Sequence, residues 1–129
     1  MARPKIFLSF DYDHDLNLKG HFIHQARQQE SPFSMNDFSL SEPYPDREWV
    51  RRAQSNIEGC DVFIVLLGRN THSAPGVLEE VGLARGSNTK RFQLKAHKGP
   101  RPPLEGAGEV ILWTWENIED KLRRLMNRG

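Results

Sequence analysis

The sequence predicts an α/β fold, with one doubly wound parallel sheet of five strands in the order 2-1-3-4-5. Short apolar runs, rich in β-branched and aromatic residues, alternate with longer segments whose apolar residues recur at helical spacing. This alternation implies right-handed crossovers between parallel strands, with helices on both faces of the sheet. The length of 129 residues suits a single domain over residues 1–129 and is too short for two ordinary domains.

The first half of the chain supplies two of the strands and two helices. Residues 5–10 form a continuous apolar run, typical of a strand buried on both faces. Residues 16–29 carry apolar side chains at helical spacing. Residues 33–40 are a weaker strand, interrupted by polar residues, which favours an edge position. Residues 41–45 contain two prolines and form a loop, and a helix with one apolar stripe follows over 46–57.

The second half supplies three strands and two helices. Residues 61–67 are the strongest strand in the sequence, and we expect them at the centre of the sheet. Ser73 is placed to cap the helix that follows this strand. The remaining elements are strands over residues 91–94 and 110–113 and helices over residues 77–85 and 118–126.

Charge and composition exclude several classes of function. Eighteen basic and seventeen acidic side chains leave a net charge of +1, which gives no overall field to attract nucleic acid or an anionic membrane. The single cysteine, Cys60, excludes an intramolecular disulfide. No apolar stretch has the length of a membrane helix, and the N-terminus lacks the apolar core of a signal peptide. We therefore expect a cytoplasmic protein without membrane or nucleic-acid partners.

The turn after the first strand is acidic, and it lies where doubly wound sheets bind their ligands. Asp11, Asp13 and Asp15 alternate there, as in clustered carboxylates that bind a divalent cation. A metal-dependent phosphoryl-transfer site would also need an aspartate after residue 67, where Gly68 follows instead. The favoured interpretation is that Asp13 and Asp15 cap a helix and complement its dipole, and no metal is expected.

Glu79 and Glu80 lie at the start of the helix after the central strand. Successive helical residues point about 100° apart, so at most one of the two faces a cleft at the end of that strand. Glu80 is beside the buried stripe, although a glutamate early in a helix is also explained by the helix dipole. The turn after the first strand contains no glycine, which argues against a dinucleotide cofactor bound in the usual way.

A basic, proline-rich patch is predicted near the fourth strand. It comprises Lys90, Arg91, Lys95, Lys98 and Arg101. Such a patch suits phosphate groups, but no aromatic residue is interleaved for base stacking, and a solvated loop is the favoured interpretation.

Several segments resemble the TIR-like family, specifically bacterial ThsB-type proteins of Thoeris antiphage defence and flavodoxin-like TIR relatives. The strand over residues 6–10 with its acidic turn resembles the opening motif of these domains. The similarity continues through residues 46–57, residues 60–68 and the helix that carries Glu79 and Glu80. It covers residues 4–95 and implies a flavodoxin-like, TIR-like fold.

The resemblance also implies a function. Members of this group cleave NAD⁺ at the nicotinamide–ribose bond, by hydrolysis or cyclisation, and the ADP-ribose-type product signals to a downstream effector. By resemblance, Glu80 rather than Glu79 is the catalytic carboxylate. Phe10 and Asp11 line the pocket, with Ser9 and Tyr44 as further substrate contacts, Tyr44 from a mobile lid over residues 41–45. NAD⁺ is then a substrate, and no cofactor is needed. The alternative is a non-catalytic TIR-like signalling or assembly module that acts through homotypic contacts.

Overall fold

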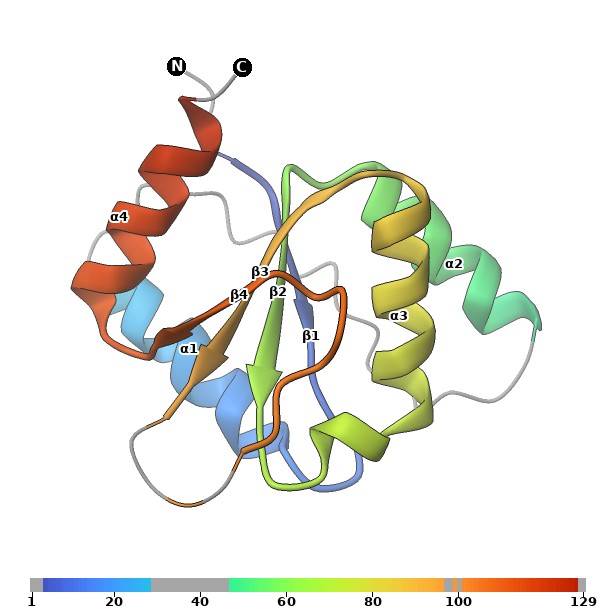
Figure 1. Ribbon diagram of the computed structural model, residues 1–129, viewed down its shortest axis with the longest axis horizontal. Coiled ribbons are helices and arrows are strands. Elements are labelled where there is room, and N and C mark those ends of the chain that lie inside the picture. The colour runs from blue at the N-terminus through green and yellow to red at the C-terminus, as the bar shows by residue number, and fades with distance from the viewer. Residues whose placement is uncertain (1–3, 29–46, 97–98, 100, 128–129) are drawn as a thin grey trace.

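The protein forms a parallel sheet between two layers of helices. The computed structural model describes residues 4–28, 47–96, 99 and 101–127. Within these ranges the sheet has four strands in the order β1-β2-β3-β4, all parallel (Figure 1). The strands are β1 (Ile6–Ser9), β2 (Val62–Leu67), β3 (Lys90–Lys95) and β4 (Glu109–Leu112).

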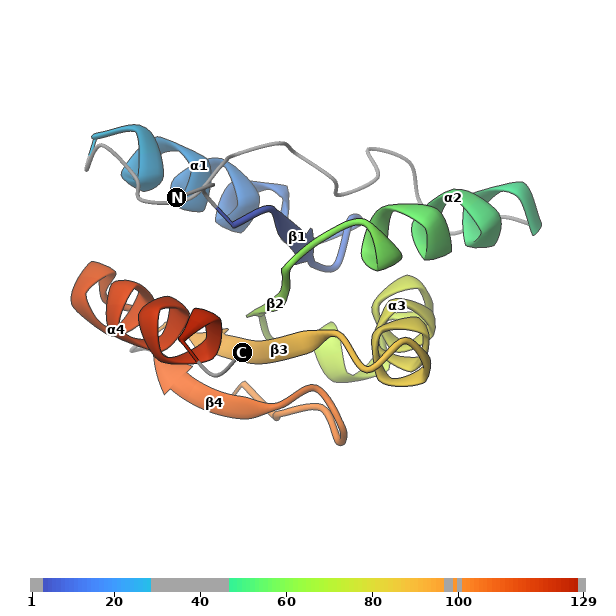
Figure 2. The ribbon, with the colours of Figure 1, turned by 90° about the horizontal axis from the view of Figure 1, so that it is seen from above.

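Within the described ranges, four α-helices cover the sheet. They are α1 (Leu16–Gln28), α2 (Arg47–Glu58), α3 (Pro75–Gly86) and α4 (Trp115–Met126), and a short 3₁₀ helix, η1 (Thr71–Ser73), precedes α3. Seen from above, α1 and α4 lie on one side of the strands and α2 and α3 on the other (Figure 2). No helix in the described ranges is long and apolar enough to cross a membrane.

The sheet divides the apolar interior into two cores, because successive strand residues point to opposite faces. In β2, Val62, Ile64 and Leu66 pack towards α1 and α4, whereas Phe63, Val65 and Leu67 pack towards α2 and α3. All six side chains are fully buried, which explains why the strand reads as one continuous apolar run. The same alternation in β1 leaves Ser9 on the α2–α3 side.

In the connection from β3 to β4, residues 101–108 form no helix. Instead, the buried amide of Gln93 accepts a hydrogen bond from the Leu104 backbone N–H and donates to the Leu104 and Gly108 carbonyl oxygens. Leu104 and Ala107 fill the core on the α2–α3 side. One polar side chain thus anchors an irregular loop over the sheet.

The predicted fold class is confirmed at the level of a parallel α/β sheet. The predicted order places the first, third, fourth and fifth strands side by side, and β1 to β4 follow that sequence. The predicted edge strand over residues 33–40 lies outside the described residues, as do the loop over 41–45 and Tyr44 within it. The strand expected over 91–94 is longer, and its neighbours β2 and β4 lie on both sides of it.

The expected cap at Ser73 is wrong. Ser73 closes η1, where its hydroxyl donates to the Asn70 carbonyl oxygen, and Ala74 is the N-cap of α3 without a side-chain hydrogen bond. Pro75 begins this helix, and a proline in the first turn has no N–H that needs a capping acceptor. The helix therefore starts two residues earlier than its apolar stripe indicates.

Candidate functional site

The strongest candidate site is a buried hydrogen bond between β1 and α3. Ser9 Oγ donates to Glu80 Oε1 at 2.7 Å. Ser9 is the last residue of β1 and faces α3 by strand alternation. Glu80 shares the inner face of α3 with Val77, Val81 and Ala84 at helical spacing. Both elements thus direct a polar side chain into an otherwise apolar layer.

Burial sets the charge state of Glu80. Ser9 is 1% exposed and Glu80 is 5% exposed. Burial raises the pKa of Glu80 to about 8, even though the hydrogen bond from Ser9 acts to lower it. Within the described ranges, no lysine or arginine side chain contacts this carboxyl group. Glu80 is therefore mostly protonated at neutral pH and can give a proton to a bound molecule.

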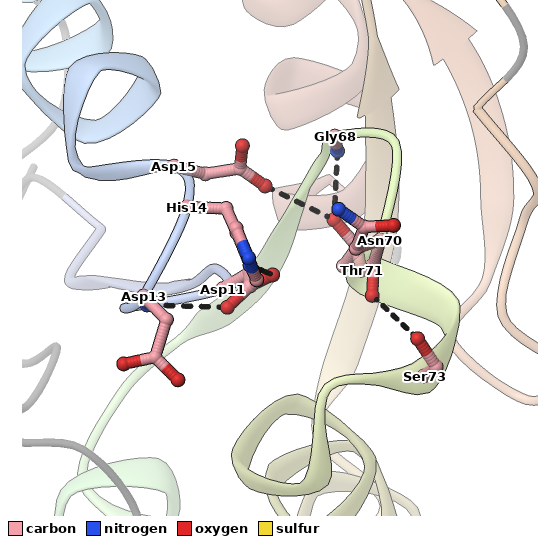
Figure 3. Close-up of polar contacts among 8 residues, drawn as sticks. All are labelled: Asp11, Asp13, His14, Asp15, Gly68, Asn70, Thr71 and Ser73. Carbon is pink, nitrogen blue, oxygen red and sulfur yellow. Dashed lines mark hydrogen bonds and ion pairs between the residues drawn. The ribbon is translucent and has the colours of Figure 1, made fainter.

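The acidic turn after β1 is held by a different set of contacts (Figure 3). Asp11 Oδ2 lies 2.6 Å from His14 Nδ1, and Asp11 Oδ1 accepts a hydrogen bond of 3.2 Å from the Asp13 backbone N–H. The hydrogen bond and negative charge of Asp11 raise the pKa of His14, whose side chain is 60% exposed. Asp11 itself is buried. The turn therefore keeps Asp11 beside an exposed histidine whose pKa is raised.

Asp15 joins this turn to the end of β2. Its carboxylate covers the backbone of Gly68, where an added Cβ would lie 2.0 Å from Asp15 Oδ2. Thr71 Oγ1 accepts a 2.7 Å hydrogen bond from the Gly68 N–H and lies 3.4 Å from Asp15 Oδ2 as a donor (Figure 3). Partial burial and the charge of Asp11 raise the pKa of Asp15, while Thr71 and Arg101 act to lower it. Because residue 68 is a glycine, the turn after β1 can pack against the turn after β2.

The predicted site residues are not all placed together. The structure brings Ser9 and Glu80 into contact and puts Asp11 in the turn directly beyond β1. Phe10 packs into the core on the α1–α4 side, with Lys19 Nζ 5.6 Å from the centre of its ring. Tyr44 lies outside the described residues. Phe10 and Glu80 thus belong to opposite faces of the sheet, and substrate contact by Phe10 stays a prediction.

Two structural residues of this edge were missed by the sequence analysis. Gly68 and Thr71 fix the turn after β2 and support Asp15. The available signal was a glycine directly after the strongest strand, followed by polar residues, since glycine there permits a close approach by another segment. In the described parts of the chain, no group of three histidine, cysteine or acidic side chains is placed to hold a metal ion.

The fold is shared with a solved enzyme structure. The CMP N-glycosidase BcmB of Clostridium botulinum is similar with a TM-score of 0.54 and 19% sequence identity, and the alignment covers 97% of this chain and 99% of that chain. No protein-family model matches the sequence, and no curated protein matches it. At this identity the similarity establishes the fold.

This finding corrects the TIR-like interpretation. The matching structure is a CMP N-glycosidase and not a TIR domain. The same finding overturns NAD⁺ hydrolysis or cyclisation in antiphage signalling, and the alternative of a non-catalytic TIR-like assembly module. The resemblance rested on β1, α2, β2 and α3. A buried apolar strand followed by a polar turn is required of any doubly wound sheet, so these segments do not discriminate between families.

Proposed function

We propose that the protein is an N-glycosidase that hydrolyses the bond between the base and the sugar of a nucleoside or nucleotide. The observation that carries the proposal is the buried hydrogen bond between Ser9 and Glu80 at the carboxyl edge of the sheet. Ligands of doubly wound sheets bind at this edge. The similar fold of a CMP N-glycosidase supports the reaction class.

The chemistry of the leaving base explains why a protonated carboxyl group is useful. A base leaves its sugar as an anion unless it receives a proton as the C1′–N bond breaks. A general acid works best when its pKa is near the working pH, and burial has raised the pKa of Glu80 to about 8. Glu80 therefore donates its proton to the departing base, in the way that glycosidases use a carboxylic acid with a raised pKa.

Glu80 then also stabilises the sugar during the reaction. Once its proton has moved to the base, Glu80 is a carboxylate next to a ribosyl group that carries developing positive charge, and it stabilises that charge electrostatically. Water adds to C1′ and gives its extra proton to Glu80, which restores the acid. The net reaction consumes one water and releases the free base and the sugar, with its phosphate where one is present.

Ser9 and Asp11 have supporting roles in this mechanism. Ser9 is a positioning residue, because its hydroxyl orients Glu80 Oε1 and holds the carboxyl in one geometry. Asp11 lies beyond the end of β1 and is an acceptor for sugar hydroxyl groups. Because Glu80 is only 5% exposed, substrate reaches it only when the side chains around it move apart.

The test is base release measured by chromatography. Purified protein is incubated separately with CMP, UMP, AMP and GMP and with the corresponding nucleosides. Glu80→Gln is expected to lower base release from the best substrate by at least about a hundredfold, because the amide keeps the shape but has no proton to donate. Glu79→Gln is the matched control, since Glu79 is the neighbouring residue on the same helix and is partly exposed.

Two results would overturn the proposal. One is the absence of free base from every nucleotide and nucleoside at high protein concentration. The other is equal activity of the wild type and Glu80→Gln, which would remove the carboxyl group from the mechanism even if base is released.

A further inference from the structure

Three positive side chains come from three different segments to the carboxyl ends of β2 and β3. Arg69 follows the end of β2 by two residues. Lys95 is the last residue of β3 and is the register partner of Leu67. Arg101 belongs to the loop after β3, and its Nη1 donates to the Leu67 carbonyl oxygen at 3.0 Å. The β3–β4 loop passes beside the end of β2 in Figure 1, in agreement with this contact.

Arg69 lies directly against that loop. Gly99 has a φ of +78°, in the left-handed region, and a Cβ at this position would lie 3.8 Å from Arg69 Nε and 4.0 Å from Nη2. The guanidinium group is therefore next to the segment that carries Arg101. Arg69 is exposed, and no acidic side chain in the described ranges forms an ion pair with it. Its charge is available to a ligand.

Lys98 of the basic patch expected from the sequence lies outside the described residues, and the other four cations separate into two groups. At the start of β3, Lys90 Nζ donates to the Leu125 carbonyl oxygen, and Arg91 donates to the carbonyl oxygens of Gly106 and Thr89. Those two cations satisfy backbone groups at the far end of the strand. Lys95 and Arg101 lie at the carboxyl end, where Arg69 joins them although it was not part of the predicted patch.

The charge of Arg101 in this cluster affects the pKa of Asp15. Arg101 lowers this pKa through charge, but burial and Asp11 have the larger effect and raise it. Asp15 is turned towards Gly68 and Thr71 on the β1 side of the β2 end. The cluster therefore presents a net positive charge beside, and not within, the acidic turn.

We infer that Arg69, assisted by Lys95 and Arg101, binds the phosphate group of the substrate, so that the protein acts on nucleoside monophosphates in preference to nucleosides. The inference rests on the proposed function. A planar guanidinium donates two parallel hydrogen bonds to phosphate oxygens, which an ammonium group cannot match. The ends of β1 and β2 are adjacent, with Ser9 opposite Val65, so one nucleotide spans from Glu80 to Arg69 along the same edge.

The experiment compares Arg69→Gln with wild type on a nucleotide and on its nucleoside. For the nucleotide, kcat/KM is expected to fall by about ten- to a hundredfold, the range for a lost hydrogen bond to a charged group. For the nucleoside it is expected to change by less than about twofold, since no phosphate contact is lost. Arg69→Lys should recover part of the loss. The matched control is Arg123→Gln, an equal change of charge on the exposed last turn of α4.

A binding measurement keeps this inference separate from the proposed function. Ribose 5-phosphate and ribose are titrated into wild type, Arg69→Gln and Arg123→Gln, and binding is followed by calorimetry. Wild type and Arg123→Gln are expected to bind ribose 5-phosphate about tenfold or more tightly than Arg69→Gln.

Equal losses on nucleotide and nucleoside, or no loss on either, would overturn the phosphate site while leaving base release by Glu80 intact. If wild type releases no base at all, the proposed function fails and the titration decides alone. Weaker binding of ribose 5-phosphate by Arg69→Gln then supports the phosphate site, and equal or absent binding overturns it.

Discussion

The carboxyl groups of Glu80 and Asp11 both lie near the end of β1, but their environments differ. Glu80 comes from α3, is almost fully buried, and has one hydroxyl partner, Ser9. Asp11 comes from the turn beyond β1 and is held by a backbone N–H and by His14, which is largely exposed. The carboxyl group of Glu80 is buried with a hydroxyl partner, whereas that of Asp11 is hydrogen-bonded to a backbone N–H and to a histidine.

The difference shows that the direction of the side chain, and not its position along the sheet edge, sets its chemistry. Burial without a cation raises the pKa of Glu80 to about 8, so the group is a proton donor at neutral pH. Asp11, by contrast, lies beside His14 and raises the pKa of that histidine.

The largest expected effect is on the pH dependence of stability. The pKa of Glu80 is 4.5 in an ordinary environment and about 8 in the folded protein. Between these values the unfolded state releases the proton and the folded state keeps it. The free energy of unfolding attributable to Glu80 therefore falls by about 1.4 kcal/mol per pH unit over this window, and becomes constant above it. Over the whole window the loss is roughly 5 kcal/mol.

Glu80→Gln removes this titration while preserving the shape of the side chain. Urea unfolding of wild type and Glu80→Gln at pH 5, 6.5 and 8 should show the variant gaining stability relative to wild type as the pH rises. Glu79→Gln should follow the wild type at every pH. Parallel curves for wild type and Glu80→Gln would mean that Glu80 is ionised when folded, and the contrast with Asp11 would disappear.

An intermediate effect is expected for Ser9→Ala. Removing the hydroxyl leaves the Glu80 carboxyl without its hydrogen-bond partner in a buried layer, which costs about 1–3 kcal/mol. The pKa of Glu80 should also move above 8, because the hydrogen bond from Ser9 lowers it.

Ser73→Ala is the matched control, since the Ser73 hydroxyl donates to the Asn70 carbonyl oxygen at an exposed site. It should change stability by less than about 0.5 kcal/mol. Urea unfolding at pH 6 compares the two variants, and repeating it up to pH 9.5 follows the shift in pKa. Equal losses for the two serines would show that the Ser9 hydroxyl is no more important than a surface contact.

Sequence periodicity was sufficient for the fold class and for the neighbours of β2. The run Val62–Leu67 is apolar at every position because both faces are covered, and this pattern has few alternatives in a chain that alternates strands with helices. The length of β3 was harder to predict. The strand begins at Lys90 and ends at Lys95, and both lysines are only partly buried. The apolar residues that indicate a strand are therefore confined to its middle.

Only part of the site could be predicted from local pattern. Ser9 and Glu80 were both selected, but their hydrogen bond joins positions 71 residues apart and depends on how α3 packs on β1. Phe10 was assigned to the same pocket by the family resemblance. Adjacent strand residues point to opposite faces, and the structure places Phe10 in the other core. The family resemblance failed for a related reason, since apolar strands and polar turns describe a fold and not a reaction.

The smallest expected effect concerns His14 and tests the exposed half of the comparison. Asp11 raises the pKa of His14 mainly through its hydrogen bond and then through its charge, with Asp13 and Asp15 contributing less. Asp11→Asn removes the charge and should return the pKa of His14 towards 6.5. Asp13→Asn should move it less. Nuclear magnetic resonance of the histidine ring protons across pH 5 to 9 measures both shifts.

The sign for stability follows from the same contact. Because the folded pKa of His14 is raised, its stabilising contribution is complete below the unfolded value of 6.5 and is lost as the pH rises through the folded value. Asp11→Asn should abolish this dependence. An unchanged pKa of His14 in Asp11→Asn would show that Asp11 does not hold the histidine in solution. The acidic turn would then owe its geometry to the Asp13 N–H, to Asp15 and to Gly68.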